Sequence, residues 1–435
     1  DELGNDDPDN LAATGFLRLG IYEYNQRDAK SHWNDIINEM TDVTGDVFLG
    51  IGMACARCHD HKFDPVLRTD YYKLRSFFEP VIWRDDVPYA TPGQLAEYQA
   101  KRRQWEEATA KVRAEIDVLL KPYYDRKWKS TVDKFPLDIQ ACYHKSIDER
   151  TSWEHQMAYL VERQFLEEGG GPLANMSKED KAEHERLKKE LAKFDDLKPP
   201  TPPKLMTVSN FDGPISHTLI PGSSIKAPIR PGFPAVLVSH STLTALTEES
   251  PRLRRTDLAN WIARGDNPLT MRLIVNRIWQ GHFSRGIVGT PNDFGHLGQP
   301  PSHPELLDWL AWTFVENGWS MKQLHRLILM SATWQQSAHH DQAESYGPLD
   351  PDDALMWRAP IRRLTAEQIR DAMLSVSGEL NDKAGGPSVD GSSNRRSLYL
   401  RSHRNKPNDF LHAFDAANGL KSVAERNRTT TPTQS

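Results

Sequence analysis

The sequence predicts a mainly α-helical protein of several domains that contains one small β module. Apolar side chains recur at three- and four-residue steps through much of its 435 residues, which is the period of a helix. Short β-like runs separated by Gly and Pro gather in residues 199–250. A chain of this length normally forms two or three domains, and it can bury a large core without disulfides.

The first segment, residues 1–93, contains an amphipathic helix and a cysteine motif. Asp28 or Ser31 is available as the N-cap of this helix. Gly50 and Gly52 follow the helix, and they allow the backbone to approach a flat group closely. The apolar face of the helix consists of Trp33, Ile36, Ile37, Met40, Val43, Val47 and Phe48.

The second segment, residues 94–198, is strongly charged but keeps helical spacing. This pattern predicts a protruding helical hairpin or a short coiled-coil arm. Pro122 and the run Gly169–Pro172 are expected to interrupt it, and a separate helix is expected over residues 147–167. Such an arm serves as a spacer or a docking surface, or it is a solvated insertion without chemistry.

The third and fourth segments are residues 199–250 and 251–435. The third opens with a stiff Pro-rich linker, and we expect no chemistry in the β module that follows. The fourth is predicted to be helical. The β-like runs are residues 205–208, 217–220 and 235–238, and a strand-like run at 397–402 interrupts the later helices. The predicted helix starts are the pairs Ser302 and Glu305, Ser320 and Gln323, and Thr365 and Gln368.

The composition argues against partners that are held by charge alone. The chain has 54 basic and 60 acidic residues and a net charge of −6, so nucleic acid and anionic membranes are not expected as partners. No apolar run approaches the length of a membrane span. The sequence starts at Asp1 without a signal peptide, which we interpret as a mature or truncated product.

The strongest chemical signal is Cys55-Ala-Arg-Cys58-His59, which has the C-x-x-C-H spacing of covalent haem attachment. Two thiols on one turn can each bond a vinyl-derived carbon of the porphyrin, and the adjacent imidazole can reach the iron from one face. The sequence therefore predicts haem c on Cys55 and Cys58 with His59 as the axial ligand of the haem iron. Candidates for the second axial ligand are Met40, Met53 and His32.

Two other interpretations of the same stretch compete with haem. A redox dithiol is expected after a strand in a thioredoxin-like unit, and no such pattern surrounds the motif. A zinc or iron site without porphyrin would recruit His61 and Asp64 as further ligands, although so many ligands in so short a stretch would strain the geometry. The remaining cysteine, Cys142, fits a small buried side chain better than a nucleophile.

A second polar cluster lies among glycines in the fourth segment, where loops are expected. Its catalytic candidates are His282, Arg285, Asp293 and His303. Such a set could bind an anionic or sugar substrate, with His as acid or base and Arg holding a carboxylate or sulfate. The alternative is a buried polar network that fixes long loops to helices. The other polar residues of the cluster are Asn276, Arg277, Asn292 and His296.

These stretches also carry a family resemblance. FLGIGMACARCHDHKFDPVLRTDYY resembles the signature of the second planctomycete cytochrome C domain family, so residues 1–93 resemble the C-terminal part of a cytochrome c-like domain. NPLTMRLIVNRIWQGHFSRGIVGTPNDFG, RRLTAEQIRDAMLSVSG and the closing ERNRTTTPTQS resemble the planctomycete-specific domain that commonly follows it. The resemblance implies that the chain starts inside the first domain and stops before the second is complete. Both families lack an established reaction.

The resemblance implies a periplasmic or extracellular protein, because members resemble exported proteins of bacteria rich in polysaccharide-degrading enzymes. Three hypotheses follow, and they leave open whether the chain is an enzyme. The first is a c-type haem protein that exchanges electrons with a redox partner or other exported proteins during the breakdown of complex polysaccharide. The second is a metal-dependent hydrolase or lyase that acts on glycans. The third is a surface-assembly scaffold in which the arm docks a partner.

Overall fold

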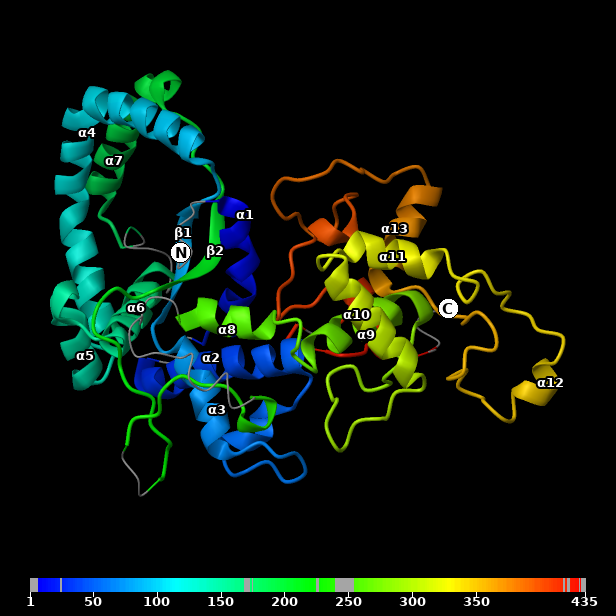
Figure 1. The fold of residues 1–435 in the computed structure, drawn as a ribbon. Coiled ribbons are helices and arrows are strands. Elements are labelled where there is room, and N and C mark those ends of the chain that lie inside the picture. Colours follow the sequence, from blue (N-terminus) through cyan, green and yellow to red (C-terminus); the bar gives the residue numbers. More distant parts are fainter. Residues whose placement is uncertain are drawn as a thin grey trace. The chain divides into compact units, whose positions relative to one another are not determined.

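The fold is known from a computed structural model, which describes residues 7–23, 26–167, 173, 175–223, 227–238, 254–417, 419–420, 423–429 and 431. The chain divides into two compact units. The first comprises Asp1–Thr41, Ala56–Asp60 and Val66–Asn260, and the second comprises Asp42–Cys55, His61–Pro65 and Trp261–Ser435. The fold is mainly helical, as predicted, and among the described residues the two named strands form a single sheet (Figure 1).

The α-helices of the first half are α1 (Pro8–Ala13), α2 (Ala29–Thr44), α3 (Arg68–Arg75), α4 (Pro92–Val132), α5 (Leu137–His144), α6 (Ser152–Glu167) and α7 (Lys178–Leu191). Those of the second half are α8 (Arg254–Ile262), α9 (Thr270–Phe283), α10 (Pro304–Glu316), α11 (Met321–Leu329), α12 (Ala343–Tyr346), α13 (Ala366–Val376) and α14 (Asp409–Ala413). No helix of the described part is long and apolar enough to cross a membrane.

The first unit is organised around two antiparallel strands that are distant in sequence, β1 (Val81–Pro88) and β2 (Lys204–Asn210). Val81 lies opposite Asn210, and Pro88 lies opposite Lys204. Large side chains fill the core of this unit because the apolar faces of α2, α3 and α6 and the strand β1 all contribute to it. The largest fully buried ones include Trp33, Ile36, Ile37, Tyr71, Leu74, Phe77, Trp83 and Met157.

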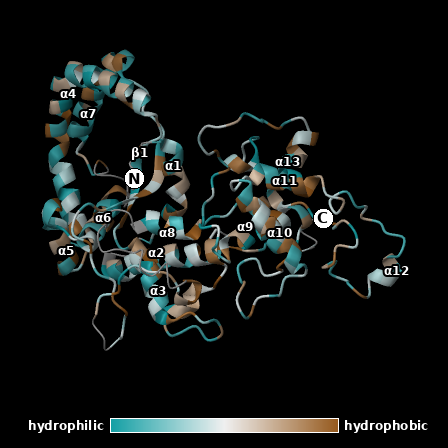
Figure 2. Ribbon diagram, in the orientation of Figure 1, coloured by the Kyte–Doolittle hydropathy of each residue, from teal (hydrophilic) through white to brown (hydrophobic). Residues whose placement is uncertain are grey.

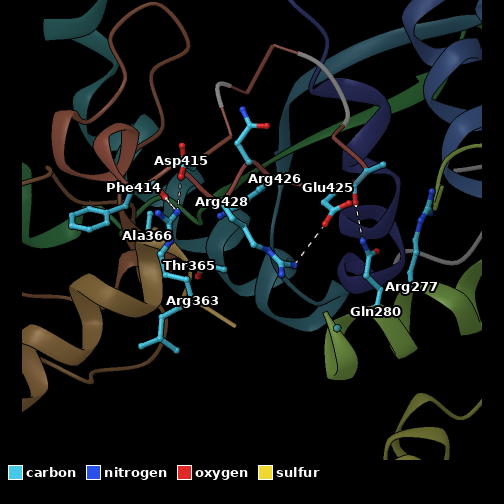
Figure 3. A pocket seen from close by; sticks show the side chains of 14 residues that line it. Arg277, Gln280, Arg363, Thr365, Ala366, Phe414, Asp415, Glu425, Arg426 and Arg428 are labelled. Atoms are coloured by element: carbon cyan, nitrogen blue, oxygen red, sulfur yellow. Dashed lines mark hydrogen bonds and ion pairs between the residues drawn. The ribbon is translucent and has the colours of Figure 1, made fainter. Parts of the chain in front are cut away.

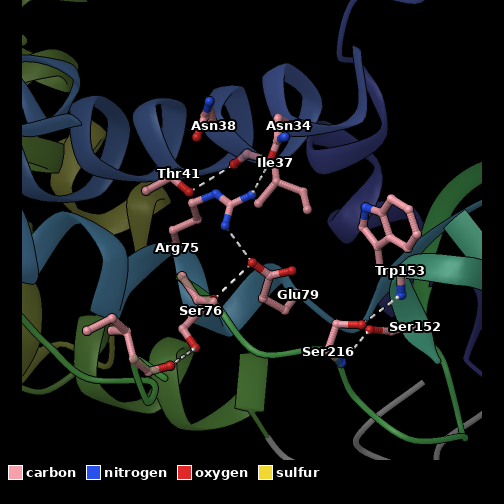
Figure 4. Close-up of polar contacts among 12 residues, drawn as sticks. Asn34, Ile37, Asn38, Thr41, Arg75, Ser76, Glu79, Ser152, Trp153 and Ser216 are labelled. Carbon is pink, nitrogen blue, oxygen red and sulfur yellow. Dashed lines mark hydrogen bonds and ion pairs between the residues drawn. The ribbon is translucent and has the colours of Figure 1, made fainter. Parts of the chain in front are cut away.

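A buried ion pair connects several elements of this core. Arg75 Nη1 lies 2.5 Å from Glu79 Oε1, and Arg75 Nη2 donates to Asn34 Oδ1 of α2 at 2.8 Å (Figure 4). The hydroxyl of Thr218 donates to the same Glu79 oxygen at 2.9 Å. The charges are therefore hydrogen-bonded as well as paired, as buried charges must be if they are not to destabilise the fold.

Two helices of the charged second segment, α4 and α7, pack against each other, and we call this pair the arm. Tyr123 of α4 donates to Asp180 of α7, and Arg186 lies 3.8 Å from Glu115, so α7 runs antiparallel to α4 (Figure 1). Figure 2 shows hydrophilic residues along most of α7. The predicted break at Pro122 is wrong, because α4 continues through it.

The exposed position of Pro122 explains why α4 can continue through it. A proline leaves the carbonyl of the residue four positions earlier without a helical donor, and that residue, Val118, is 75% exposed, so water can bind the carbonyl. The helix predicted at 147–167 exists as α6, but it belongs to the core and not to the arm. Gln156 of α6 donates to the main-chain carbonyls of Glu79 and Val81 at 2.8 and 2.9 Å.

The predicted β module needs correction. The run 205–208 lies in β2, but its partner is β1 from the first segment. The run 217–220 contributes one bridge, between Thr218 and Ile229, and the run 235–238 begins with a 3-10 helix, Ala235–Leu237. Prolines explain this outcome, because each lacks the N–H that a strand ladder needs. They are Pro221, Pro228, Pro231 and Pro234.

The second unit packs α9, α10 and α11 around one apolar cluster. Two predicted helix starts are confirmed, since Ser320 accepts from the N–H of Gln323 and Thr365 forms a capping box with Gln368. The helix expected to start at Ser302 has His303 as its N-cap, without a side-chain cap, and the strand-like run at 397–402 begins as a 3-10 helix, Ser397–Tyr399. The cluster includes Val275, Trp279, Phe283, Leu307, Leu310, Phe314, Leu324 and Ile328.

Candidate functional site

The backbone that leads to the cysteine motif departs from regular helix. The helix α2 continues as a π-helix, Gly45–Leu49, and ends at Gly50 with a φ of +59°. A Cβ at Gly50 would lie 2.9 Å from Leu273 Cδ1, and the Gly50 carbonyl accepts the N–H of Phe294 at 2.8 Å. The freedom of Gly50 therefore serves close packing within the second unit, whereas Gly52 has open space around it. Single π-turns occur frequently at functional sites.

The two motif thiols are chemically accessible. Cys55 lies in the 3-10 helix Met53–Arg57, and both Cys55 and Cys58 are exposed and free of disulfides. Cys142 is buried, its thiol donates to the Asp138 carbonyl at 3.2 Å, and burial raises its pKa. Since a reactive thiol needs exposure and an accessible thiolate, the motif thiols are the ones suited to covalent attachment.

The ring of His59 is oriented as a metal ligand requires. Its Nδ1 lies 2.7 Å from the carbonyl oxygen of Asp60. A carbonyl oxygen can only accept, so Nδ1 carries the proton and the lone pair of Nε2 is free. Metal-ligating histidines typically donate their second ring N–H to a backbone carbonyl or carboxylate in this way.

Helix α3 holds the segment that carries His59. The main-chain N–H of Arg68 donates to Asp60 Oδ1 at 2.7 Å, and Arg68 Nε donates to the Arg57 carbonyl at 3.3 Å. The hydroxyl of Tyr72 donates to the same carbonyl at 3.2 Å. These contacts lie within the first unit and fix the turn around His59.

His61 has the opposite arrangement. The main-chain N–H groups of Asp64 and Phe63 donate to its Nδ1 at 2.8 and 3.4 Å. The neutral ring then carries its proton on Nε2, so the 3.3 Å approach of Nδ1 to Asp64 Oδ2 is not an ion pair in this tautomer. Both ring nitrogens of neutral His61 are therefore occupied, one by backbone donors and one by a proton.

Asp64, the other candidate ligand of a non-haem metal, also has a structural contact. Its Oδ1 accepts the N–H of His296 at 2.7 Å, and a Cβ at Gly295 would lie 2.5 Å from that oxygen. Within the described part of the chain, no group of three or more His, Cys, Asp or Glu side chains is placed to hold a metal ion. His61 Nδ1 and Asp64 Oδ1 thus both accept main-chain N–H groups in this structure.

The three candidates for the second axial ligand are all buried. His32 is 7% exposed, Met40 4% and Met53 0%. The Nε2 of His32 is buried without a hydrogen-bond partner among the described residues, and burial lowers the pKa of this ring. His32 therefore offers a buried ring nitrogen without a partner among the described residues, and imidazole nitrogens are common metal ligands.

Each of the four catalytic candidates of the fourth segment has a hydrogen-bond partner outside the set of four. His282 Nε2 lies 2.7 Å from His325 Nδ1, and burial together with the charges of His325 and Arg362 lowers the pKa of His282. The other three contact separate partners: Arg285 donates to Gln299 at 2.9 Å, Asp293 accepts the N–H of Gly295 at 2.9 Å, and His303 contacts Ser302 at 3.0 Å. Among the described residues, no hydrogen bond or ion pair joins any two of the four.

Neighbouring polar residues instead fix the long loop. Asn276 is fully buried, accepts the N–H of Val288 at 2.8 Å and donates to the Val288 carbonyl at 3.0 Å. Arg277 donates to the carbonyls of Val47 and Asp46 at 2.6 and 2.8 Å and to Asn292 Oδ1 at 2.7 Å. The geometry favours the polar network over a catalytic set.

Sequence reasoning missed a cavity in the second unit. It has a volume of about 240 Å³ and lies between α9, the start of α13, residues 414–415 and residues 424–428 (Figure 3). Four arginines line it, and two of them belong to the run Glu425-Arg426-Asn427-Arg428. The basic run was visible in the sequence, but its juxtaposition with α9 and α13 was not.

Comparison with known proteins identifies the two ends of the chain. Residues 1–82 match the family PSCyt2, described as a protein of unknown function (DUF1549), and residues 254–435 match the family PSD1, described as a protein of unknown function (DUF1553). No curated protein and no solved structure matches the chain. The chain therefore carries a PSCyt2 region followed by a PSD1 region, the two planctomycete families that its motifs resemble, in the order expected.

Proposed function

We propose that this chain is an exported c-type haem protein with an electron-transfer or oxidoreductase role. Cys55 and Cys58 would hold the haem through thioether bonds, and His59 would bind the iron through Nε2. The observation that carries the proposal is the 2.7 Å contact between His59 Nδ1 and the Asp60 carbonyl, which leaves Nε2 free. The cytochrome-type family of residues 1–82 supports the same class.

The residues around the motif have distinct tasks in this proposal. The exposed thiols accept the covalent attachment, and the Asp60 carbonyl orients the imidazole and raises its basicity as a ligand. Arg68 and Tyr72 hold the turn in place. Bound haem would supply one-electron chemistry, and its potential would depend on the second axial ligand, for which His32 is the strongest of the three candidates.

The biological setting that we infer is complex polysaccharide breakdown outside the cytoplasm. This inference rests on the family resemblance, and it fits the export that attachment of haem c requires. Electron exchange would then involve a redox partner or another exported protein.

The test is expression with an export signal in a host that attaches haem c, followed by a pyridine haemochrome spectrum and extraction with acidified acetone. We expect a c-type spectrum and haem that stays with the protein. Cys55→Ala combined with Cys58→Ala should lose covalent haem, whereas Cys142→Ala should keep it. His59→Ala should change the iron spectrum, and His61→Ala should not.

Two results would contradict the proposal. One is folded, colourless protein from cells in which a control cytochrome matures normally. The other is zinc or iron without porphyrin that is lost when His61 or Asp64 is replaced, which would support the hydrolase or lyase hypothesis instead.

A further inference from the structure

The arginine-lined cavity of the second unit has unused hydrogen-bond donors. Its walls carry Arg277, Arg363, Arg426 and Arg428, together with Asp415 and Glu425. Arg363 is neutralised by Asp415 at 2.6 Å, and Arg277 is held by main-chain carbonyls and Asn292. These two arginines therefore build the wall, which leaves Arg426 and Arg428 as the groups that can face a ligand.

Arg426 offers one complete edge of its guanidinium. Its Nη1 donates to Glu367 at 2.7 Å, and neither Nε nor Nη2 has a partner among the described residues. The Nε–Nη2 edge is the one that grips a carboxylate elsewhere in this molecule, where Arg18 donates to both oxygens of Asp85 at 2.7 and 2.6 Å. The free edge thus has the fork geometry that matches a planar or tetrahedral oxyanion.

Arg428, two residues further along the chain than Arg426, lines the same cavity (Figure 3). Its Nη2 donates to the Ser284 carbonyl at 3.1 Å and lies 3.8 Å from Glu425, while Nε and Nη1 have no partner in the described part of the chain. Two guanidinium groups with free donors therefore line one small cavity.

The start of α13 also lines the cavity. Ala366 is the first residue of this helix, and its main-chain N–H has no acceptor among the described residues, while the carboxylate of Glu367 in the same turn pairs with Arg426. The first N–H groups of a helix lack internal partners, and the positive end of the helix dipole favours an anion there. The N-terminus and the two arginines favour the same sign of charge.

The size of the cavity limits the ligand. Sites for drug-sized ligands usually measure about 300–1,000 Å³, and this cavity measures about 240 Å³. We propose that it binds a small organic anion, no larger than one sugar ring, through a carboxylate or sulfate group held by Arg426, Arg428 and the N-terminus of α13. This proposal does not depend on haem.

The test is calorimetric or ligand-observed NMR titration of the full chain with glucuronate and with glucose 6-sulfate, and with neutral glucose as the control. We expect saturable binding of at least one anion, weakened by added salt, and no binding of glucose. Arg426→Gln and Arg428→Gln should each lower the association constant by about tenfold or more, because each removes charge-assisted hydrogen bonds. Arg401→Gln, at an exposed arginine of the same unit outside the cavity, should leave it unchanged.

The two anions distinguish the sources of the oxyanion. Preference for glucuronate would indicate a carboxylate ligand, and preference for glucose 6-sulfate would indicate a sulfate ester. The proposal is overturned if neither anion binds at millimolar concentration, if glucose binds equally well, or if both arginine variants, shown by circular dichroism to be folded, bind as the parent does.

Discussion

The cysteine motif and the loop of residues 284–303 are both dense in side chains that bind ligands, but the structure uses those side chains differently. In the motif, the thiols of Cys55 and Cys58 form no disulfide, and the Nε2 of His59 has no hydrogen-bond partner among the residues that the structure describes. Beside the loop, Asn276 and Arg277 of α9 bind main-chain groups, those of Val288 and the carbonyl of Val47. The number of polar side chains in a region is therefore a weak guide to its chemistry. Which partner each hydrogen-bond donor and acceptor has is a better guide.

Two histidines that are neighbours in the sequence, His59 and His61, lead to the same conclusion. His59 and His61 are both candidate ligands by type, but His59 donates through Nδ1 to a carbonyl, whereas His61 accepts through Nδ1 from backbone N–H groups. The two rings therefore hold their protons on opposite nitrogens. One ring leaves a lone pair for a metal, and the other completes a turn.

The largest expected effect tests the loop. Gly286→Ala would place a Cβ 2.5 Å from the Val288 carbonyl oxygen and 2.6 Å from the amide nitrogen of Asn276, so it should disrupt the contacts of both residues. We expect it to lower the free energy of unfolding by about 3 kcal/mol, as overpacking of a rigid site does. Urea denaturation followed by tryptophan fluorescence measures the loss, because Trp279 lies in the same cluster.

Gly281→Ala is the matched control. This glycine lies in α9, and a Cβ added to it would meet nothing within 4 Å, so alanine should be neutral or stabilising by up to about 1 kcal/mol. Equal stability of the two variants would show that the loop is not fixed by this network and would reopen the catalytic interpretation.

An intermediate effect concerns the π-helix, whose Asp46 carbonyl is bound by Arg277. Burial and the nearby charge of Asp42 raise the pKa of Asp46 from an ordinary 3.8 to about 6, against the opposing effect of Arg277. The folded state then binds a proton more tightly than the unfolded state, so stability declines as pH rises between these values and stays level above them.

Asp46→Asn should therefore stabilise the chain at about pH 8 by about 1–2 kcal/mol, after allowance for solvent screening, and should have little effect near pH 4. Urea denaturation at the two pH values measures the difference. A variant that is less stable than the parent at the higher pH would show that the ionised carboxylate, and not its protonated form, is the favoured partner of Arg277.

The smallest effect sharpens the contrast between the two histidines. His61→Ala removes the acceptor of two main-chain N–H groups and should cost about 1–2 kcal/mol. His59→Ala, measured on protein without haem, should change stability by less than about 0.5 kcal/mol, since its ring is exposed and makes one local contact. Thermal unfolding of both variants tests this, and the reverse order would exchange the roles assigned to the two rings.

Local signals in the sequence were sufficient for part of the fold. Asp28 accepts the N–H of Ser31 at the start of α2, and Ser320 and Thr365 cap their helices as their spacing predicts. Ser302 fails as a cap because its N–H and hydroxyl both bind the Ile287 carbonyl. Distant contacts of this kind leave no local trace in the sequence.

The site shows the same division. The spacing of Cys55, Cys58 and His59 identified the candidate attachment residues, because covalent geometry alone explains that spacing. The tautomers of His59 and His61 depend on which main-chain group meets each ring. The cavity depends on α9 and α13 coming together with residues 414–415 and 424–428. The helical periodicity and the motif spacing of the sequence predict neither the tautomers nor the cavity.

The arm also has a consequence for how this protein can change. Its chain leaves β1 and returns to β2 at one point, where the N–H of Tyr89 donates to the Pro203 carbonyl at 2.7 Å. The far end of α4 is also fixed, because Trp128 of α4 stacks on Phe165 of α6 with ring centroids 3.8 Å apart, and Gln156 of α6 binds the carbonyls of Glu79 and Val81. Turns added to or removed from α4 alone would therefore displace α6 from the first unit, so the length of α4 is constrained at both of its ends.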